Sequence, residues 1–346
     1  MDGGHASHGG TKPIVDALAR AHKDKGGRMS SSAHDHHGGP GPARVREVSD
    51  GVFAYIQPDG TWFINNTGFL VARGGVTSID TCSTERRTRD YLAAIAKTSR
   101  QPVRTLINTH HHGDHTYGNW LLPGATIVAH DRCRDEVLAA GPPYFPGVFT
   151  DVDWGEVHVA PPFLTYSEGV TLYCDDLRCE VRFVGTPAHT TNDSVVWIPD
   201  RSVLFPGDLI FNGGTPFLLM GSVAGAVGVL ENVVRPLSPR TIVPGHGETC
   251  GPEVIDSVLG YLRFVQETAR RGRAAGLSPL EAARDTDLGQ YAELGDPERI
   301  VGNLHRAYAD LDAQASGGGL GTPLNYPAIL GDMVAYNGGK PLTCLA

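Results

Sequence analysis

Apolar residues recur along the chain with two different spacings, which together predict alternating strands and helices. Short runs rich in Val, Ile, Leu and Phe, bounded by Gly, Pro or Asp, are typical of strands. Such runs cover residues 52–57, 62–72, 76–80, 103–107, 126–129, 170–173, 177–184, 194–198, 203–205 and 241–243. Apolar residues three or four positions apart predict helices over residues 83–97, with Ser83 as N-cap, and over 131–140, 223–234, 254–273 and 297–313. Ser278, Pro279 and Glu281 have the spacing of a capping box that opens a further helix.

The order of these elements predicts an α/β fold with appendages at both ends. The first three strands are joined by short turns, as in a β-meander, and strands then alternate with helices twice. We expect a disordered Gly- and His-rich tail over residues 1–42, a core over 43–250, a C-terminal helical extension over 251–315, and a Gly-rich linker with an apolar tail over 316–346. Met29 offers a second start, and we expect translation to begin there rather than at Met1.

The octapeptide Asn-Thr-His-His-His-Gly-Asp-His, which ends at His115, carries most of the candidate chemistry. In an extended segment alternate side chains share a face, so His110, His112 and Asp114 point the same way, and His110 and His112 can hold one metal ion. Gly113 lets the backbone bend and can bring Asp114 and His115 onto a second ion. Imidazole and carboxylate groups suit zinc, so the octapeptide predicts a metal site.

This octapeptide resembles the His-x-His-x-Asp-His motif of the metallo-β-lactamase superfamily. That family uses three further ligands in a set order, and His189, Asp208 and His246 follow later apolar runs, each beside Gly or Pro. The resemblance implies a four-layer αβ/βα sandwich with two zinc ions at one sheet edge; iron and manganese are alternatives. The implied ligands are His110, His112 and His189 for the first ion, Asp114, His115 and His246 for the second, and Asp208 between the two.

Two zinc ions would support two kinds of reaction. Zinc lowers the pKa of bound water from about 15.7 towards about 7, so that a hydroxide can attack a carbonyl carbon at neutral pH. Alternatively, the hydroxide or Asp114 removes a proton next to a carbonyl, which leads to an aldol condensation. Asp114 is therefore the candidate catalytic residue, and the ligand set does not choose between these reactions. Many true β-lactamases carry cysteine at the position of Asp208, and aspartate there is similar to the glyoxalase II, lactonase and thioesterase branches.

Other stretches resemble a smaller family, the actinomycete second-ring cyclases of aromatic polyketide pathways (actinorhodin cyclase type). These stretches are residues 152–156, 215–217, 221–223, 251–256, 303–307 and 334–346. The resemblance implies aldol ring closure with dehydration of a polyketide, free or bound to a carrier protein, with thioester hydrolysis as an added step. The alternative is a zinc-dependent hydrolase of a thioester, ester or lactone, of the glyoxalase II or lactonase type. A non-catalytic metal-binding protein is a third interpretation, which the complete ligand set disfavours.

Substrate contacts are predicted from position along the chain. The candidates either follow a ligand, lie on the strand predicted over residues 62–72, or stand in the C-terminal tail; they are Trp62, Asn66, Asn192, Asn212, Phe217 and Tyr336. The Pro- and Gly-rich loop 141–168 carries several aromatic residues, which either line a substrate pocket or pack as a satellite cluster on the core.

Composition narrows the partners and the compartment. The formal net charge of −9 argues against nucleic acid, because such binding relies on clustered Lys and Arg. No apolar run approaches the roughly 18 residues of a membrane span, and the N-terminus has no apolar signal core. Six scattered cysteines are typical of reduced thiols. We therefore expect a cytoplasmic enzyme for a small molecule; the sequence leaves open whether it forms a homo-oligomer.

Overall fold

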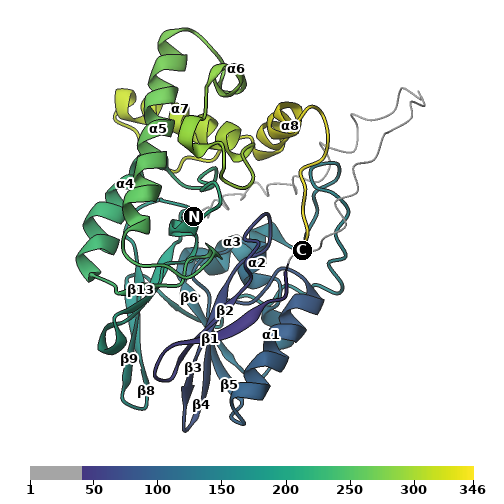
Figure 1. The fold of residues 1–346 in the computed structure, drawn as a ribbon, viewed down its shortest axis with the longest axis vertical. Coiled ribbons are helices and arrows are strands. Elements are labelled where there is room, and N and C mark those ends of the chain that lie inside the picture. Colours follow the sequence, from purple (N-terminus) through teal and green to yellow (C-terminus); the bar gives the residue numbers. More distant parts are fainter. Residues whose placement is uncertain (1–40) are drawn as a thin grey trace, which may run out of the picture. The chain divides into compact units, whose positions relative to one another are not determined.

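A computed structural model describes residues 41–346 (Figure 1). All but the last two residues of the predicted N-terminal tail, and the question of Met1 or Met29, lie outside the described residues. Residues 43–250 and the predicted C-terminal extension belong to one compact unit by their internal contacts.

The first sheet has seven strands in sequence order. They are β1 (Arg44–Ser49), β2 (Val52–Ile56), β3 (Thr67–Ala72), β4 (Gly75–Ile79), β5 (Val103–Ile107), β6 (Thr126–His130) and β7 (Leu164–Tyr166). Neighbours from β1 to β4 are antiparallel, which confirms the predicted meander; short turns join β1 to β2 and β3 to β4, and a longer connection joins β2 to β3. Neighbours from β4 to β7 are parallel, because longer connections return the chain to the same end of the sheet.

The second sheet has five strands in the order β13-β11-β10-β9-β8. Their bounds are β8 (Gly169–Cys174), β9 (Leu177–Phe183), β10 (Ser194–Ile198), β11 (Val203–Phe205) and β13 (Thr241–Ile242). A separate parallel pair joins β12 (Phe211–Asn212) to β14 (His246–Gly247). The inner faces of the two large sheets share one buried cluster, in which Ile56 and Ile107 of the first sheet meet Val196 and Phe205 of the second.

Helices cover the outer faces of both sheets and complete four layers. Helix α1 (Glu85–Thr98) buries Tyr91 and Ile95 against the first sheet. Helices α4 (Val223–Val229) and α5 (Val254–Ala274) belong to the buried cluster that includes Val195 and Trp197 of the second sheet. Because Val195 and Val196 point to opposite faces of β10, each sheet is buried on both sides. The predicted four-layer α/β sandwich is therefore confirmed.

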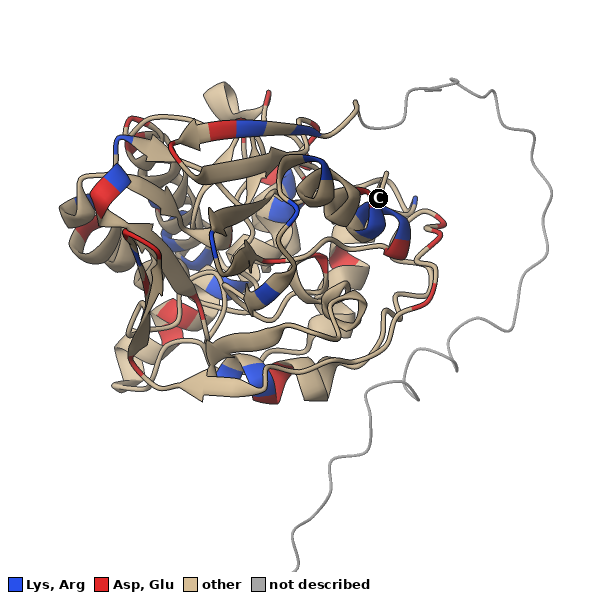
Figure 2. Cartoon of the chain, turned by 90° about the horizontal axis from the view of Figure 1, so that it is seen from below, with Lys and Arg blue, Asp and Glu red and all other residues tan. Residues whose placement is uncertain are grey.

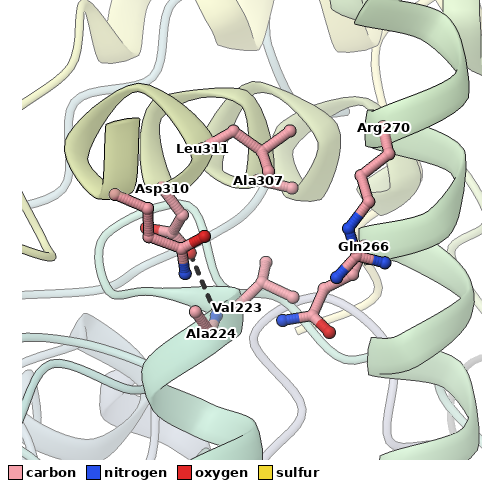
Figure 3. Close-up of a pocket in the computed structure, with 8 residues that line it drawn as sticks. Val223, Ala224, Gln266, Arg270, Ala307, Asp310 and Leu311 are labelled. Carbon is pink, nitrogen blue, oxygen red and sulfur yellow. Dashed lines mark hydrogen bonds between the residues drawn. The ribbon is translucent and has the colours of Figure 1, made fainter. Parts of the chain in front are cut away.

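The C-terminal helices pack beyond this sandwich, as Figure 1 shows. They are α6 (Pro279–Asp285), α7 (Arg299–Ser316) and α8 (Tyr326–Tyr336). Helix α6 opens on the predicted capping box between Ser278 and Glu281. A small pocket lies between α7, α4 and α5, and Asp310 at its wall accepts a hydrogen bond from Ala224 N (3.0 Å) (Figure 3). Asp310 also accepts one from Ser222 Oγ (2.9 Å). Asp310 thereby caps α4 from a distant part of the sequence.

Several predicted boundaries were wrong for identifiable reasons. The strand predicted over 62–72 begins only at Thr67, because Phe63 adopts a left-handed conformation (φ 60°) in a turn. Thr84, not Ser83, caps α1. The helix predicted over 223–234 is α-helical to Val229 and continues as a π-helix, ahead of Pro236, which cannot continue an α-helical ladder.

Several elements were missed, among them two strands of the first sheet and one C-terminal helix. Strands β1 and β7 lie at the two edges of the first sheet, and β7 falls within the loop predicted over 141–168. The tail predicted over 316–346 contains helix α8, whose Ile329 and Met333 are buried. The chain is thus ordered in three places where local composition favoured a loop.

The helices and the charged residues of the described part bear on membrane and nucleic-acid contacts. None of its helices combines the length and the apolar character that crossing a membrane requires. Lys and Arg are scattered among Asp and Glu along the described chain (Figure 2).

Candidate metal centre

The histidine-rich octapeptide follows β5 and turns sharply at Gly113. Residues 113–116 form the single-turn helix α2 (Gly113–Thr116), so the segment is not extended as far as Asp114. The expectation that Asp114 shares a face with His110 and His112 by strand alternation was therefore wrong. The helical turn places Asp114 and His115 in a cluster of their own, as the predicted bend at Gly113 requires.

The other three candidate ligands follow strands of the second sheet or lie beside it. His189 is in the connection between β9 and β10, and Asp208 lies in a 3₁₀ turn (Gly207–Leu209) after β11. His246 is the first residue of β14. Loops that follow strands of both sheets thus meet at one edge of the sandwich.

The seven predicted ligands form two clusters that share one carboxylate. Ligand atoms of His110, His112, His189 and Asp208 lie within 4.8 Å of one another, and so do those of Asp114, His115, His246 and Asp208. In the first cluster, His189 Nε2 lies 2.8 Å from His112 Nδ1 and 3.5 Å from Asp208 Oδ2. In the second, His246 Nε2 lies 3.2 Å from both Asp114 Oδ2 and Asp208 Oδ2. Asp208 is placed to bridge two ions.

Close backbone packing fixes Asp208 in this position. Gly207 adopts a left-handed conformation (φ 56°), and a Cβ there would meet the side chain of Thr109. A Cβ on Gly245 would overlap Oδ1 of Asp208. The Gly-Asp and Gly-His pairs of the sequence therefore reflect the close approach of two loops at the shared carboxylate.

Each histidine of the clusters uses its other ring nitrogen for a contact outside the clusters. His115 Nδ1 lies 2.8 Å from Asp80, His189 Nδ1 lies 2.5 Å from the carbonyl of Phe217, and His246 Nδ1 lies 3.1 Å from the carbonyl of Gly60. His110 Nδ1 contacts Thr109 Oγ1 (3.0 Å), and His112 Nε2 contacts the sulfur of Met220 (3.2 Å). Such outer partners fix the ring orientation and tautomer of metal-binding histidines.

Asp80 contacts a predicted ligand and was not among the candidates from the sequence. It follows β4 with a left-handed backbone (φ 59°), and its carboxylate accepts hydrogen bonds from the backbone N and Oγ1 of Thr109, both at 2.7 Å, besides its contact with His115. It therefore joins the start of the octapeptide to its end. The available signal was an acidic residue directly after a buried strand, in Asp80-Thr81-Cys82.

Burial and neighbouring charges together lower the pKa of two histidines in the first cluster and raise the pKa of both histidines in the second. Burial, reinforced by neighbouring imidazoles, lowers the pKa of His110 and His112 well below the ordinary value. Burial also disfavours the charged form of His115 and His246, but Asp208 and Asp114 outweigh it and raise both pKa values, that of His246 to about 9. For Asp208, burial is likewise outweighed, by His246 and His115, so its pKa is lowered well below its usual range.

The residues fit a pair of metal ions. Nε2 of His110 and Nε2 of His115 are buried without a hydrogen-bond partner, as is Oδ1 of Asp208. Buried polar atoms rarely remain unpaired, and a metal ion would satisfy all three. Five imidazoles with two carboxylates form a nitrogen- and oxygen-rich ligand set of the kind that zinc accepts.

The predicted substrate contacts fare less well than the ligands. Asn66 is buried, and its amide bonds Gln57 N, Pro244 O and Gly247 O, so it is a structural residue. Asn192 is fully buried and bonds His111, so it supports the octapeptide instead.

The four remaining candidates occupy different surroundings. Trp62 is almost buried, and its indole N–H donates to Glu298 (2.6 Å). Asn212 donates to the carbonyl of Glu248, and Tyr336 ends α8 among the C-terminal helices. Phe217 is half-buried next to the clusters, since its carbonyl contacts His189.

Aromatic side chains form a continuous belt beside the clusters. Tyr117, directly after α2, contacts Trp154 (ring centroids 6.0 Å apart), and Trp154 contacts Phe63 (5.0 Å). The belt continues from Phe63 through Phe149 and Trp62 to Phe217, with centroid separations of 5.0–5.2 Å. Of the two interpretations of loop 141–168, the structure shows that its rings pack on the core, and most of the belt remains half-exposed.

Comparisons with known proteins agree with this geometry. Residues 60–246 match the sequence model of the metallo-beta-lactamase superfamily. The chain is similar to a hydroxyacylglutathione hydrolase of Rhodospirillum rubrum, with 28% identity over 220 residues that cover 63% of this chain and 74% of the relative. It is also similar to a type 2 metallo-beta-lactamase of Bacteroides fragilis, with 24% identity over 239 residues that cover 65% of this chain and 88% of the relative.

Solved structures show the same fold. A metallo-beta-lactamase from Pontibacter korlensis aligns with a TM-score of 0.53 and 21% identity, covering 64% of this chain and 99% of that protein. At this identity the likeness concerns the fold alone. The segment that matches the family model ends at His246, so helices α5 to α8 lie outside it.

Proposed function

The chain belongs to the metallo-beta-lactamase superfamily, and from this premise we propose that it is a two-zinc hydrolase of an ester or thioester. The observation that carries the proposal is the carboxylate of Asp208, which both ligand clusters share. Two adjacent metal sites bridged in this way suit hydrolysis of a carbonyl compound. The similarity to a hydroxyacylglutathione hydrolase supports the same reaction class.

In this proposal the seven residues divide as the clusters do. His110, His112 and His189 would hold one ion, Asp114, His115 and His246 the other, and Asp208 both. Zinc bound there supplies Lewis acidity and a water-derived nucleophile at neutral pH. Iron and manganese are the alternative metals.

The protein's own groups prepare the site for this chemistry. Burial raises the pKa of Asp114, but His115 and His246 outweigh it and lower the pKa below its ordinary value, so the carboxylate is ionised at neutral pH and can accept a proton at Oδ2. Asp80 holds the His115 ring in one orientation.

A second candidate function is aldol ring closure of an aromatic polyketide, free or attached to a carrier protein. The belt from Tyr117 to Phe217 favours it, because half-exposed aromatic rings suit a flat apolar substrate. The metal centre is the same for both reactions, so only the product distinguishes them.

Two substrates separate these functions. The zinc-loaded protein is incubated with S-lactoylglutathione and, separately, with a synthetic poly-β-ketone thioester, and the products are identified by mass spectrometry. Release of the free acid from either thioester supports the hydrolase. Loss of water from the poly-β-ketone without release of the thiol would instead establish the cyclase.

A further inference from the structure

Three arginines are buried in the described part of the chain, and two of them pair their terminal guanidinium nitrogens with backbone or carboxylate oxygens. Arg299 donates to the carbonyl of Thr215 (2.9 Å) and forms an ion pair with Asp296 (2.7 Å). Arg306 donates to the carbonyls of Leu219 and Thr322. In both residues the terminal guanidinium nitrogens have oxygen acceptors within the protein.

The third arginine, Arg87, obtains no such partner. Arg87 is 7% exposed, yet no hydrogen bond or ion pair joins its guanidinium to any described residue; its Nε is buried without an acceptor, whereas its terminal nitrogens reach the surface. A guanidinium has five donors and stays charged in proteins. The terminal nitrogens of Arg87 are therefore free of protein acceptors and open to water or to an anionic ligand.

Arg87 lies in the first turn of α1, which adjoins the metal centre on one side and the aromatic belt on the other. Thr81, just before this helix, donates through N and Oγ1 to the carbonyl of His115, both at 3.0 Å. Glu85 N donates to the carbonyl of Trp154 (3.1 Å), and Glu85 accepts from Glu156 N (2.8 Å). The helix start is therefore fixed between a metal-binding loop and the belt.

Two cysteine thiols are influenced by the charges of both Arg87 and Asp114. Cys82 and Cys344 both lie within electrostatic range of Arg87 and of Asp114. Cys344 also donates to the carbonyl of Trp62 (3.4 Å), which places it beside the belt.

No nearby carboxylate supplies the missing acceptor. Asp59 is the acidic residue whose charge favours the ionised form of Arg87, but its contribution is the weakest of the neighbours. The Asp59 carboxylate accepts instead from the backbone N and Oγ1 of Thr61, within its own turn.

We propose that Arg87 is the anchor of a subsite for an anionic group of the substrate, a carboxylate or a phosphate, beside the metal centre. A planar guanidinium matches such oxyanions with paired hydrogen bonds. The inference rests on the proposed function, because it places the anionic group on the same molecule whose carbonyl reaches the metal ions. The substrate is then an acidic ester or thioester rather than a neutral one.

The first test needs no turnover. Sulfate at millimolar concentration is added to the zinc-loaded protein and its thermal unfolding midpoint is compared with that in sodium chloride of equal ionic strength. Three proteins are measured: the wild type, Arg87→Met, and Arg86→Met, which removes the exposed neighbouring charge. Sulfate should raise the midpoint of the wild type and of Arg86→Met, and should leave Arg87→Met unchanged.

The same series separates an anchor from a structural residue. Without sulfate, Arg87→Met should unfold at the wild-type temperature or above it, because methionine removes an unpaired buried cation. Destabilisation of Arg87→Met in that buffer, or an equal response to sulfate in all three proteins, would overturn the proposal. Either result can be obtained even if the protein turns over no thioester.

A kinetic comparison then identifies the source of the anion. For a thioester that carries a carboxylate, Arg87→Met should raise KM about tenfold or more with little change in kcat, since a charge-assisted hydrogen bond contributes roughly 1.5–3 kcal/mol. For the methyl ester of the same compound, KM should not change. Equal effects on both compounds would show that the subsite does not bind the substrate's anionic group.

Discussion

At the scale of single residues, the two clusters differ in their neighbours. His115 and His246 face the carboxylates of Asp114 and Asp208, whereas His110 and His112 face other imidazoles. The first pair therefore holds protons in the metal-free protein, and the second pair does not. Metal binding at the second cluster must therefore displace protons from His115 and His246, whereas His110 and His112 of the first cluster are already neutral.

This asymmetry predicts a different pH dependence for the two metal affinities. Below its pKa of about 9, His246 is protonated, so the affinity of the second cluster should fall as the pH drops from 9 to 7. The affinity of the first cluster should change much less, because the pKa values of His110 and His112 lie well below that range. Competition with a zinc chelator at several pH values measures both; a parallel loss at the two sites would contradict the prediction.

A glycine substitution tests the contact that fixes the shared carboxylate. In Gly245→Ala the new methyl group overlaps Oδ1 of Asp208, so both metal affinities should fall about 10- to 100-fold, as for other changes that displace a ligand. Gly228→Ala, where a methyl group meets open space, is the matched control and should bind zinc as the wild type does. The prediction fails if the two variants retain the same two equivalents of zinc after dialysis.

At the scale of elements, the segments beyond the matched family region support the metal centre. The guanidinium of Arg299 on α7 lies over the rings of Trp62 (4.1 Å) and Phe211 (5.3 Å), and Phe211 stacks on His246 with ring centroids 4.8 Å apart. Its ion pair with Asp296 completes this arrangement. Helix α7 therefore contacts a predicted metal ligand through a single intervening ring.

Removal of this arginine should destabilise the protein. Arg299→Met leaves Asp296 buried and unpaired, which typically costs about 3–5 kcal/mol. Burial already raises the pKa of Asp296 to about 6, and loss of Arg299 should raise it further. The double variant Arg299→Met/Asp296→Asn should recover part of the stability. Urea unfolding measures all three free energies, and equal stability of the single and double variants would show that the pair does not act as described.

Some of the secondary-structure elements could be predicted from the sequence. The strands 103–107, 194–198 and 203–205 and the capping box at Ser278 were predictable, because their signals lie within a few residues. Thr126–His130 and Leu177–Phe183 were displaced by one residue from their predicted ends. Strand β7 was not predictable, because it gains its hydrogen bonds from β6, which lies far away in the sequence.

In the candidate metal centre, too, features with a local sequence signal were predictable and features that depend on distant contacts were not. The seven candidate ligands could be named because their motif order is specific, and the structure brings them together in two groups that could hold metal ions. Their role as ligands stays a prediction. The predicted roles of Asn66 and Asn192 could not be corrected from sequence, since their partners Pro244 and His111 come from other loops. The same holds for Asp80, whose role depends on a contact with His115.

At the scale of the whole molecule, the metal ions should contribute to the stability of the sandwich. The ligands come from both halves of the fold and are buried, so bound metal ions would link the two halves in the native state. A ligand present at 1,000 times its dissociation constant stabilises the native state by about 4.1 kcal/mol. Chelation should therefore lower the thermal unfolding midpoint by several degrees, and two equivalents of zinc should restore it. An unchanged midpoint in calorimetry would contradict this.

The central claim is that two metal ions at these clusters carry out hydrolysis. The most direct measurement titrates the metal-free protein with zinc while thioester cleavage and bound metal are recorded together. The account predicts that activity reaches its maximum at about two equivalents of zinc, and that Asp208→Ala, which lacks the shared carboxylate, stays inactive at any zinc concentration. Full activity in the chelated protein, or in Asp208→Ala, would contradict the account.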